Sequence, residues 1–599
     1  MPVESVYDRL EPLLPLVRKP VQYVGGELNA VVKDWDAADV RWALMYPDAY
    51  EVGVANQGIQ ILYEVLNGCD GVLAERTYSV WPDLENLMRE RGIGQFTVDG
   101  HRPVRAFDVF GVSFATELGY TNLLTALDLA GIPLSAARRG EEDPLVIAGG
   151  HAAFNPEPIA DFVDVFLIGE AEEMLPEFLA VLESARRREL SRAALLEEAA
   201  SIPGAYVPRF YEPVYEGPRL VGLSGAHAER RILRRLIDDL DRFPTTTQIL
   251  AEDVAFGDMF LVEASRGCQW GCRFCAAGFM YRPLRTRSAA SLKDDVVRGL
   301  QSRSTIGLVG AEMASVPGIA DLCQTIADHG GRASPASLKA DCISPALAAA
   351  LGRNRSRTVT IAPEAGSERM RRVINKNLRE PEILRAAEML IGEGVQDLKL
   401  YFMIGLPTET DADVDAIADL TLAVRERFMG KGRERGRIGA ITISVNNFVP
   451  KPWTPLQWDP MIEVSAAKSK LGRLRARLRS VANVDVEGES PREAYLQTLL
   501  SRGDRRVARW IVALSEATRR GASWWQELRR GRGGKRADEG LVDPDGFVHR
   551  AYDHDERLPW DFIDHQVRKL YLWTEHEKAI RERETPPCDV STCKTCGAC

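Results

Sequence analysis

Two long stretches of this chain alternate short apolar, β-branched runs with amphipathic segments of helical length, and this pattern constrains the fold most. In the first stretch, residues 39–185, the expected strands are 40–47, 108–114, 145–150 and 163–169, and the expected helices are 55–67, 121–131 and 172–187. This order predicts an α/β fold with a doubly wound, Rossmann-like parallel sheet, whose ligand lies beyond the carboxyl ends of the strands.

The second stretch contains six expected strands: 259–268, 304–310, 336–341, 358–366, 397–407 and 440–450. Helix-length intervals separate them, which suits a partial or full βα-barrel of the TIM type. Beyond about residue 490 the pattern changes to Arg-rich and Trp-rich helices, followed by a loose Gly-rich loop and a Cys-rich end.

The length of 599 residues requires more than one core, because single cores stop growing near about 250–300 residues. We expect six segments: an N-terminal extension (1–38), a Rossmann-like domain (39–200), a connector (201–250), a barrel (251–490), a mainly helical C-terminal region (491–587) and a Cys-rich metal-binding tail (588–599).

The charge pattern and the hydrophobic pattern exclude some classes of protein. The net charge is −10 and is spread over short runs of both signs, so no basic footprint for tight nonspecific nucleic-acid binding is visible, although a local basic channel is compatible with it. The N-terminal segment has no basic region followed by an apolar run, and no stretch of about 18 apolar residues occurs. We expect a cytoplasmic protein that does not enter a membrane.

Seven of the ten cysteines fall in two tight clusters, while Cys69, Cys323 and Cys342 stand alone. Close spacing in a large unsecreted chain favours metal ligands over disulfides. The three isolated cysteines are expected to be small buried apolar residues.

The first cluster, Cys268, Cys272 and Cys275, has the spacing C-x3-C-x2-C and directly follows an apolar strand. Thiolates are the usual ligands of iron–sulfur clusters, and a 4Fe-4S cluster with three cysteines keeps one iron open for an outside ligand. Gly267 and Gly271 allow the backbone to fold tightly around such a core. The alternative is a structural zinc site, which the position after a barrel strand disfavours.

At these residues the sequence resembles the radical S-adenosylmethionine (SAM) superfamily, and the resemblance covers roughly residues 256–455. It implies that Cys268, Cys272 and Cys275 are the catalytic cluster ligands and that SAM chelates the open iron. One electron from the cluster then cleaves SAM into methionine and a 5′-deoxyadenosyl radical. It also implies that Phe274 lies near adenine and that a small flavodoxin- or ferredoxin-type protein supplies the electron.

Further positions match the superfamily's SAM-binding segments. Gly310 and Glu312 correspond to its Gly-Gly-Glu pattern, with Ala311 as a departure, and imply contact with the methionine amino group. Glu364 and Ser367 resemble its Glu-x-Gly-Ser strand end, which implies ribose and carboxylate contacts. Gly405 and Pro407 resemble its Gly-Leu-Pro turn under adenine.

Each of these positions also has a structural reading. Glu312 can be a helix-start carboxylate, Ser367 can be a helix N-cap, and the turn at Gly405 can be an ordinary tight turn.

The order of the domains resembles the cobalamin-dependent subclass of this superfamily. Residues 147–150 (Ile-Ala-Gly-Gly) and 168–172 (Ile-Gly-Glu-Ala-Glu) match its strand-end motifs. The resemblance implies cobalamin contacts from Gly149, Gly150, His151, Gly169 and Glu170.

The Asp-x-His-x-x-Gly motif that can supply a lower cobalt ligand is absent from the sequence. The alternatives are that His151 is a loop histidine bonded to backbone and that the domain kept its fold without cobalamin. The whole arrangement looks like a family of fused radical SAM proteins with an N-terminal cobalamin-binding-like domain, and that resemblance implies cofactors but no substrate.

The second cluster, Cys588, Cys593, Cys596 and Cys599, ends the chain with the spacing C-x4-C-x2-C-x2-C. Four thiolates so close together fit a tetrahedral zinc or a second 4Fe-4S cluster, and the alternative is a solvated redox tail or a disordered end. Upstream, the Arg-rich helix near residues 505–520 and Trp524 and Trp525 could line a path for a polynucleotide, or could form helices with an apolar face and solvated arginines.

These expectations favour a cobalamin-dependent radical methyltransferase acting on an unactivated carbon. The alternatives are a radical SAM enzyme without methyl transfer, for rearrangement, cyclisation or sulfur insertion, an RNA-associated modification enzyme, and a noncatalytic module. The intact cysteine triad argues against the last. The substrate is not indicated.

Overall fold

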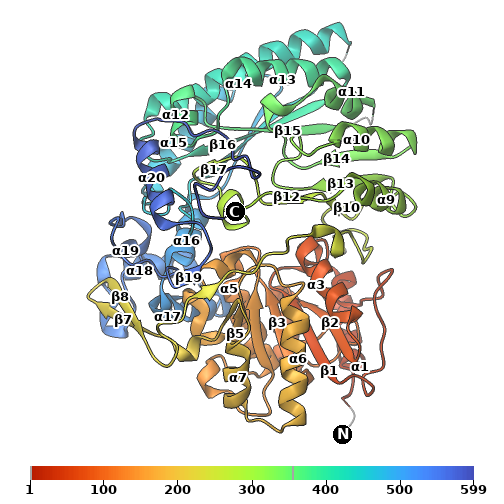
Figure 1. Cartoon of the computed structure of the whole chain (residues 1–599), viewed down its shortest axis with the longest axis vertical. Helices are drawn as coiled ribbons and strands as arrows, with labels where there is room; N and C mark the ends of the chain where they lie inside the picture. The colour runs from red at the N-terminus through yellow and green to blue at the C-terminus, as the bar shows by residue number, and fades with distance from the viewer. Residues whose placement is uncertain (1–2, 244, 354–356, 437, 599) are drawn as a thin grey trace.

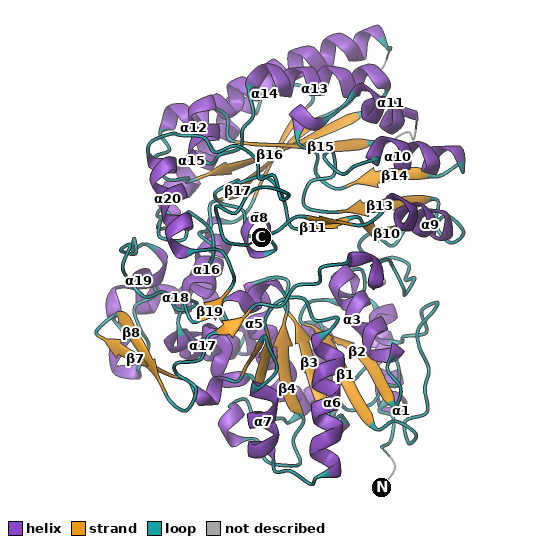
Figure 2. Ribbon diagram, in the orientation of Figure 1, coloured by secondary structure: helices purple, strands orange, loops and turns teal. Residues whose placement is uncertain are grey.

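The computed structural model describes residues 3–243, 245–353, 357–436 and 438–598. An N-terminal sheet and a barrel form two lobes, one above the other in Figure 1, and the C-terminal helices lie along one side of both. Figure 2 shows that helices flank the sheet of each lobe. No helix in the described ranges combines the length and the apolar content that a membrane-spanning helix requires.

The N-terminal lobe is a six-stranded sheet in the order β2-β1-β3-β4-β5-β6, in which the first five strands are parallel and β6 pairs antiparallel with β5. The strands are β1 (Val40–Tyr46), β2 (Val72–Tyr78), β3 (Val109–Ser113), β4 (Leu145–Gly149), β5 (Val165–Leu167) and β6 (Ala205–Tyr206). The order reverses between β1 and β3, and such a switch point is where doubly wound sheets bind ligands.

Helices cover both faces of this sheet, so successive side chains of each strand enter different cores. On β1, Trp42 and Leu44 pack with α3 and α6, whereas Ala43 and Met45 pack on the opposite face, which α5 covers. The helices of this lobe are α1 (Tyr7–Leu10), α2 (Tyr50–Gly53), α3 (Gln57–Gly68), α4 (Pro82–Arg91), α5 (Tyr120–Ala130), α6 (Met174–Arg187) and α7 (Arg192–Ala200).

The barrel consists of two parallel sheets, β10-β13-β14 and β15-β16-β17-β18, joined by a bridge between Leu338 and Ile361. Its strands are β10 (Met259–Glu263), β13 (Thr305–Val309), β14 (Arg332–Pro335), β15 (Thr358–Glu364), β16 (Asp397–Ile404), β17 (Ile441–Asn447) and β18 (Val484–Gly488). The helices around it are α8 (Ala277–Met280), α9 (Ala289–Gly299), α10 (Ile319–Asp328), α11 (Pro345–Arg353), α12 (Glu368–Val373), α13 (Glu380–Glu393), α14 (Asp411–Glu434) and α15 (Val464–Leu478).

The predicted α/β class, with a doubly wound sheet followed by a parallel barrel, is confirmed. The third barrel strand was placed wrongly: it is β14, at Arg332–Pro335, and the expected segment 336–341 forms only the bridge at Leu338. Strands β2 and β18 were not expected. The small pairs β7 (Glu212–Glu216) with β8 (Arg219–Ser224), β9 (Ile232–Leu233) with β19 (Ile563–Asp564), and β11 (Ser265–Arg266) with β12 (Arg285–Thr286) lie in connecting segments.

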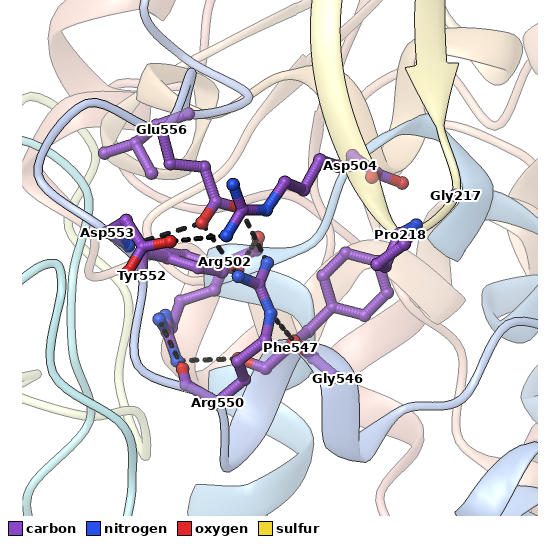
Figure 3. Close-up of polar contacts among 12 residues, drawn as sticks. Gly217, Pro218, Arg502, Asp504, Gly546, Phe547, Arg550, Tyr552, Asp553 and Glu556 are labelled. Atoms are coloured by element: carbon purple, nitrogen blue, oxygen red, sulfur yellow. Dashed lines mark hydrogen bonds and ion pairs between the residues drawn. The ribbon is translucent and has the colours of Figure 1, made fainter.

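The C-terminal region is mainly helical, with α16 (Pro491–Arg502), α17 (Ala508–Arg519), α18 (Trp524–Gly531), α19 (Asp545–Val548) and α20 (Lys569–Ile580). Many of its arginines bind backbone inside the protein. Figure 3 shows buried Arg502 donating to the carbonyl oxygens of Phe547 (2.7 Å) and Arg550 (3.0 Å), while Arg550 forms an ion pair with Glu556. Arg506 donates to the carbonyl of Pro218 in the β7–β8 turn.

Candidate active site

The three cysteines of the first cluster lie on one loop, between the first barrel strand and α8. Cys268 follows β11, Cys272 is buried, and Cys275 precedes α8 by two residues. Gly267 starts the loop at a φ of +76°, and a Cβ there would lie 2.3 Å from the carbonyl oxygen of Tyr281. Only glycine fits this position, so the loop geometry is fixed by the sequence.

The environment of these thiols fits a cationic metal core. Burial, reinforced by the other two thiols, raises the pKa of Cys268 to about 12, and burial likewise raises the pKa of Cys275 to about 11. Without a metal the thiols would therefore stay protonated at neutral pH. Iron–sulfur clusters bind thiolates, and their positive core supplies the charge that stabilises three of them at close range.

Two buried lysines, which the sequence reading did not single out, lie beside the loop. The Nζ of Lys339 is 3.9 Å from the ring centroid of Trp270 and donates to the carbonyl of Asn377 at 3.0 Å. Lys376 lies 3.4 Å from the carboxylate of Glu364, and its charge acts on the thiols of Cys272 and Cys275. Lys376 belongs to the segment after Ser367 that carried the resemblance, so the signal for it was present.

Most of the residues expected to contact SAM lie at the same rim of the barrel as the cysteine loop. Glu364 ends β15 at a φ of +68°, and Gly405 directly follows β16 at a φ of +83°. The amide of Gly405 donates to the carboxylate of Glu409, and Pro407 lies in the same turn. Phe274 packs, partly buried, against the apolar cluster that contains Met370 and Phe448.

Two of the residues expected to bind SAM, Glu312 and Ser367, make the local structural contacts that their alternative interpretations predicted. Glu312 accepts hydrogen bonds from the amides of Ala314 (2.8 Å), Ser315 (2.9 Å) and Lys339 (3.1 Å), so its carboxylate shapes a turn. Ser367 caps α12 by accepting from the amide of Met370, and it donates to Asp413 at the start of α14.

A cavity of about 370 Å³ separates the two lobes. Its floor is formed by the carboxyl ends of β3, β4 and β5 together with Trp42 and Leu44 of β1, and its other wall by β10, β13 and the start of the cysteine loop. Apolar side chains from β1, α3 and α6 line the part of the cavity along one face of the N-terminal sheet, and we call this part the slot. The lining includes Gly149, Gly150, Gly169, Glu170 and Gly310 among the residues singled out from the sequence, together with Trp42, Gly58, Ile61, Leu175, Arg266, Gly267 and Tyr281.

The glycines of this lining allow backbones to approach closely. Gly150 has a φ of +91°, and a Cβ there would lie 2.6 Å from the carbonyl oxygen of Phe114. Gly169 pairs with Arg235, so a Cβ would strike that backbone at 2.1 Å. His151 faces the cavity indirectly, because its Nδ1 lies 3.3 Å from the hydroxyl of Tyr281 and the two rings stack.

Glu170 and Glu172 clamp the two lobes together across the cavity wall. Glu170 forms a bidentate ion pair with Arg285 (2.7 and 2.8 Å) and accepts from the amide of Ile237, while Glu172 pairs with Arg266 at 2.6 Å. Pairing with these arginines and the bond from Ile237 outweigh burial and lower the pKa of Glu170, so its carboxylate stays ionised. The strand-end motif therefore has a structural role in this protein.

The Cys-rich tail lies against the cysteine loop. The amide of Cys588 donates to the carbonyl of Gln269 at 2.8 Å, and Cys596 is 2% exposed. Cys599 lies outside the described residues. Across the described ranges, no three His, Cys, Asp or Glu side chains converge closely enough to bind a single metal ion.

Comparison with known proteins gives two family matches. Residues 58–208 match the family described as radical SAM proteins, N-terminal, and residues 262–421 match the radical SAM superfamily. An uncharacterised protein of Methanocaldococcus jannaschii is 27% identical over 479 residues, which are 78% of this chain and 90% of that protein.

Solved structures with a similar fold include two radical SAM enzymes. The methyltransferase TsrM from Kitasatospora setae, with tryptophan and a SAM analogue bound, is 13% identical with a TM-score of 0.45, over 68% of this chain and 73% of that chain. The cobalamin-dependent enzyme OxsB, with aqua-cobalamin and SAM bound, is 12% identical with a TM-score of 0.46, over 91% of this chain and 80% of that chain.

Proposed function

Through residues 262–421 this chain belongs to the radical SAM superfamily, and on that premise we propose that it is a cobalamin-dependent radical methyltransferase acting on an unactivated carbon. Two cofactor sites are needed for that reaction. One generates the radical, and the other carries the methyl group.

The radical site is the cysteine loop and the barrel rim beside it. A 4Fe-4S cluster with SAM supplies a carbon-centred radical there. Cys268, Cys272 and Cys275 hold the cluster. At the rim beside them the negative carboxylate of Glu364 and the positive ammonium group of Lys376 lie 3.4 Å apart. A zwitterionic ligand such as SAM, with its amino and carboxylate groups, can pair with both.

The cavity between the lobes is the observation that carries the proposal of cobalamin. It opens where the strand order of the N-terminal sheet reverses, and it reaches the ends of β10 and β13 and the loop glycine Gly267. Cofactors of α/β sheets bind at such points, and the active sites of barrels lie at the carboxyl ends of their strands. This cavity, the chamber between the lobes, thus joins the edge where the sheet would bind its ligand to Gly267 and Gly310, which border the radical site.

The shape of the cavity suits a flat ring with a side arm. Glycines at the ends of β4 and β5 leave a smooth floor on which a macrocycle could lie. The slot between α3, α6 and the sheet is apolar, with Trp42, Ile61 and Leu175 in its walls, and would accept an aromatic base. Cobalamin combines these two parts, a corrin ring and a nucleotide tail.

Tyr281 would set the side of the chamber toward the C-terminal region. It lines the cavity, lies next to the cis peptide bond between Arg282 and Pro283, and is held by the stacked ring of His151. Burial raises the pKa of Tyr281 far above neutrality, so its hydroxyl remains a hydrogen-bond donor.

The test is methyl labelling without a substrate. Anaerobically reconstituted protein, loaded with hydroxocobalamin and desalted, is given a strong reductant and SAM with a deuterated methyl group. We expect the extracted cobalamin to carry the labelled methyl group, with one S-adenosylhomocysteine formed per methyl transferred. Protein that elutes colourless from the desalting column, or bound cobalamin without label, would contradict the proposal.

A further inference from the structure

Helix α20 and the described part of the tail after it contact the cysteine loop at several points. Arg273, between two of the cluster cysteines, forms a buried ion pair with Glu575 of α20 at 3.1 Å and donates to the carbonyl of Arg583 at 2.6 Å. Asn375 joins the two segments, because it donates to the carbonyl of Gly271 and accepts from the amide of Thr585.

The tail brings its own thiols to this loop. The amide of Cys588 is bonded at 2.8 Å to the carbonyl of Gln269, the neighbour of Cys268. Given standard backbone dimensions, the Cα atoms of Cys268 and Cys588 lie within about 10 Å of each other. The Cys593 thiol contacts that of Cys588. Cys596 is fixed by its own carbonyl, which accepts from the amide of Arg568 at 2.9 Å.

Arg282 lies between the two groups of cysteines. Its guanidinium donates to the carbonyl of Gly278 (2.7 Å), touches the Cys596 thiol and lies within electrostatic range of Cys593. It is only 3% exposed, yet no carboxylate of the described residues forms an ion pair with it. Its polar partners, the carbonyl oxygens of Gly278 and Trp270 and the hydroxyl of Tyr571, are all neutral, so an anion at the tail cysteines would give Arg282 an ion pair that it otherwise lacks.

We infer that Cys588, Cys593 and Cys596 hold a second iron–sulfur cluster, which passes electrons to the cluster on the loop. A metal centre ligated by thiolates is anionic and would pair with Arg282. The electron transfer that we infer requires iron rather than zinc at this place, because zinc cannot carry an electron.

The inference rests on the radical chemistry of the proposed function, and its electrons balance. A reduced flavodoxin- or ferredoxin-type protein gives one electron to the tail cluster, which becomes reduced by one unit. That electron then reduces the loop cluster and reoxidises the tail cluster. The loop cluster would finally transfer this electron to SAM, which breaks the bond between sulfur and C5′ and yields methionine and the 5′-deoxyadenosyl radical.

The test separates two electron donors. The full chain with Cys588→Ser, Cys593→Ser and Cys596→Ser is compared with wild type, using dithionite, which reaches the loop cluster directly, and reduced flavodoxin. We expect the triple variant to contain about four irons per chain fewer than wild type. Its electron paramagnetic resonance signal from the loop cluster should be the same as in wild type. With flavodoxin, 5′-deoxyadenosine formation should fall by at least an order of magnitude, while with dithionite it should persist. Cys69→Ser, which removes a half-buried thiol far from the loop in sequence, should change neither quantity.

A second variant tests the tail cluster by its iron content and midpoint potential, without a measurement of enzyme activity. Arg282→Gln removes the buried cation, so the tail cluster should keep its iron and its midpoint potential should become more negative. Loss of zinc instead of iron in the triple variant, or flavodoxin-driven cleavage equal to wild type, would overturn the inference. Loss of cleavage with both donors would assign the tail a structural role and overturn it as well. Failure of the proposed function would show differently, as wild-type protein that forms no 5′-deoxyadenosine with dithionite.

Discussion

Each cysteine of the loop is placed where burial keeps its thiol protonated unless a metal is bound. Cys268, with a pKa of about 12, shows this most clearly. Changing Cys268→Ala should leave the loop with two thiols and abolish reductive cleavage of SAM, since a 4Fe-4S cluster needs all three. Iron analysis and chromatographic detection of 5′-deoxyadenosine under dithionite check this. Retained 5′-deoxyadenosine would refute the assignment of the cluster.

His151 is expected to make stability depend on pH. Burial lowers its pKa to about 4, and Lys451 acts in the same direction. In the unfolded chain the pKa is near the ordinary histidine value of 6.5. Between these values the unfolded state binds more protons, so the stability that His151 contributes is present above pH 6.5 and is lost as the pH falls toward 4.

His151→Gln should remove this part of the dependence, worth at most about 3 kcal/mol. The measurement is the thermal midpoint of wild type and variant from pH 7 to pH 4.5, and the midpoint of wild type should fall more steeply with falling pH than that of the variant. His329→Gln, at an exposed position, serves as the control and should follow wild type. Parallel curves for wild type and His151→Gln would contradict the prediction.

At the level of single residues, sequence reasoning found the cysteines but not their supporting contacts. Glu312 accepts a hydrogen bond in a turn and Ser367 caps a helix, and both contacts are made with residues two or three positions along the chain. The structural roles of these two residues were therefore predictable from the local sequence. Lys339 and Arg282 gain their positions only when distant segments meet, and nothing in their sequence neighbourhood distinguishes them from surface cations.

Among the elements, α20 is the support of the cysteine loop. Glu575 of α20 forms an ion pair with Arg273 of the loop, and both side chains are almost fully buried. Removing one partner of such a pair typically costs about 3–5 kcal/mol of folding stability. Glu575→Gln should therefore speed hydrogen exchange of the loop amides at 267–276. On the same helix, the exposed pair of Glu577 and Arg581 is worth no more than about 1 kcal/mol, so Glu577→Gln should leave the exchange unchanged. Equal exchange in the two variants would show that α20 does not hold the loop.

Helix α3 offers a direct test of the slot. Gly58 lines the cavity, whereas Gly68, the last residue of the same helix, has open space around it and does not. Gly58→Phe should block the slot and lower the affinity for hydroxocobalamin by an order of magnitude or more, while Gly68→Phe should bind like wild type. Absorbance titration measures both affinities, and equal binding by the two variants would exclude the slot as the site of the nucleotide tail.

The elements that the sequence reading missed have physical explanations. Strand β2 was missed because charged residues such as Glu75 and Arg76 are unusual in a buried strand. Arg76 is buried here because Glu27 and Asp99, from other segments of the chain, form ion pairs with it. Strand β14 ends at Pro335, so the apolar residues after it, which suggested a strand, belong to the following turn. Strands β1, β3 and β4 were predictable because their apolar runs are buried almost throughout, and β10, β16 and β17 because every second residue of theirs is buried.

At the scale of the whole molecule, the alternation of strands and helices was enough to predict two α/β lobes and the edge at which each binds ligands. It was not enough to predict the contacts that fix the geometry between the lobes. The ion pairs of Glu170 with Arg285 and Glu172 with Arg266 set that geometry, and they join segments about one hundred residues apart. The docking of the tail on the loop depends on the same long-range assembly.

We propose that the radical cluster and cobalamin share the chamber between the lobes, and the magnetic interaction between the two cofactors measures this most directly. Protein loaded with cobalamin and reduced so that both the loop cluster and cobalt(II) are paramagnetic should give an electron paramagnetic resonance spectrum with dipolar splitting from the pair. Two superimposed spectra without interaction, from protein in which both cofactors are bound, would place cobalamin outside the chamber and contradict the account.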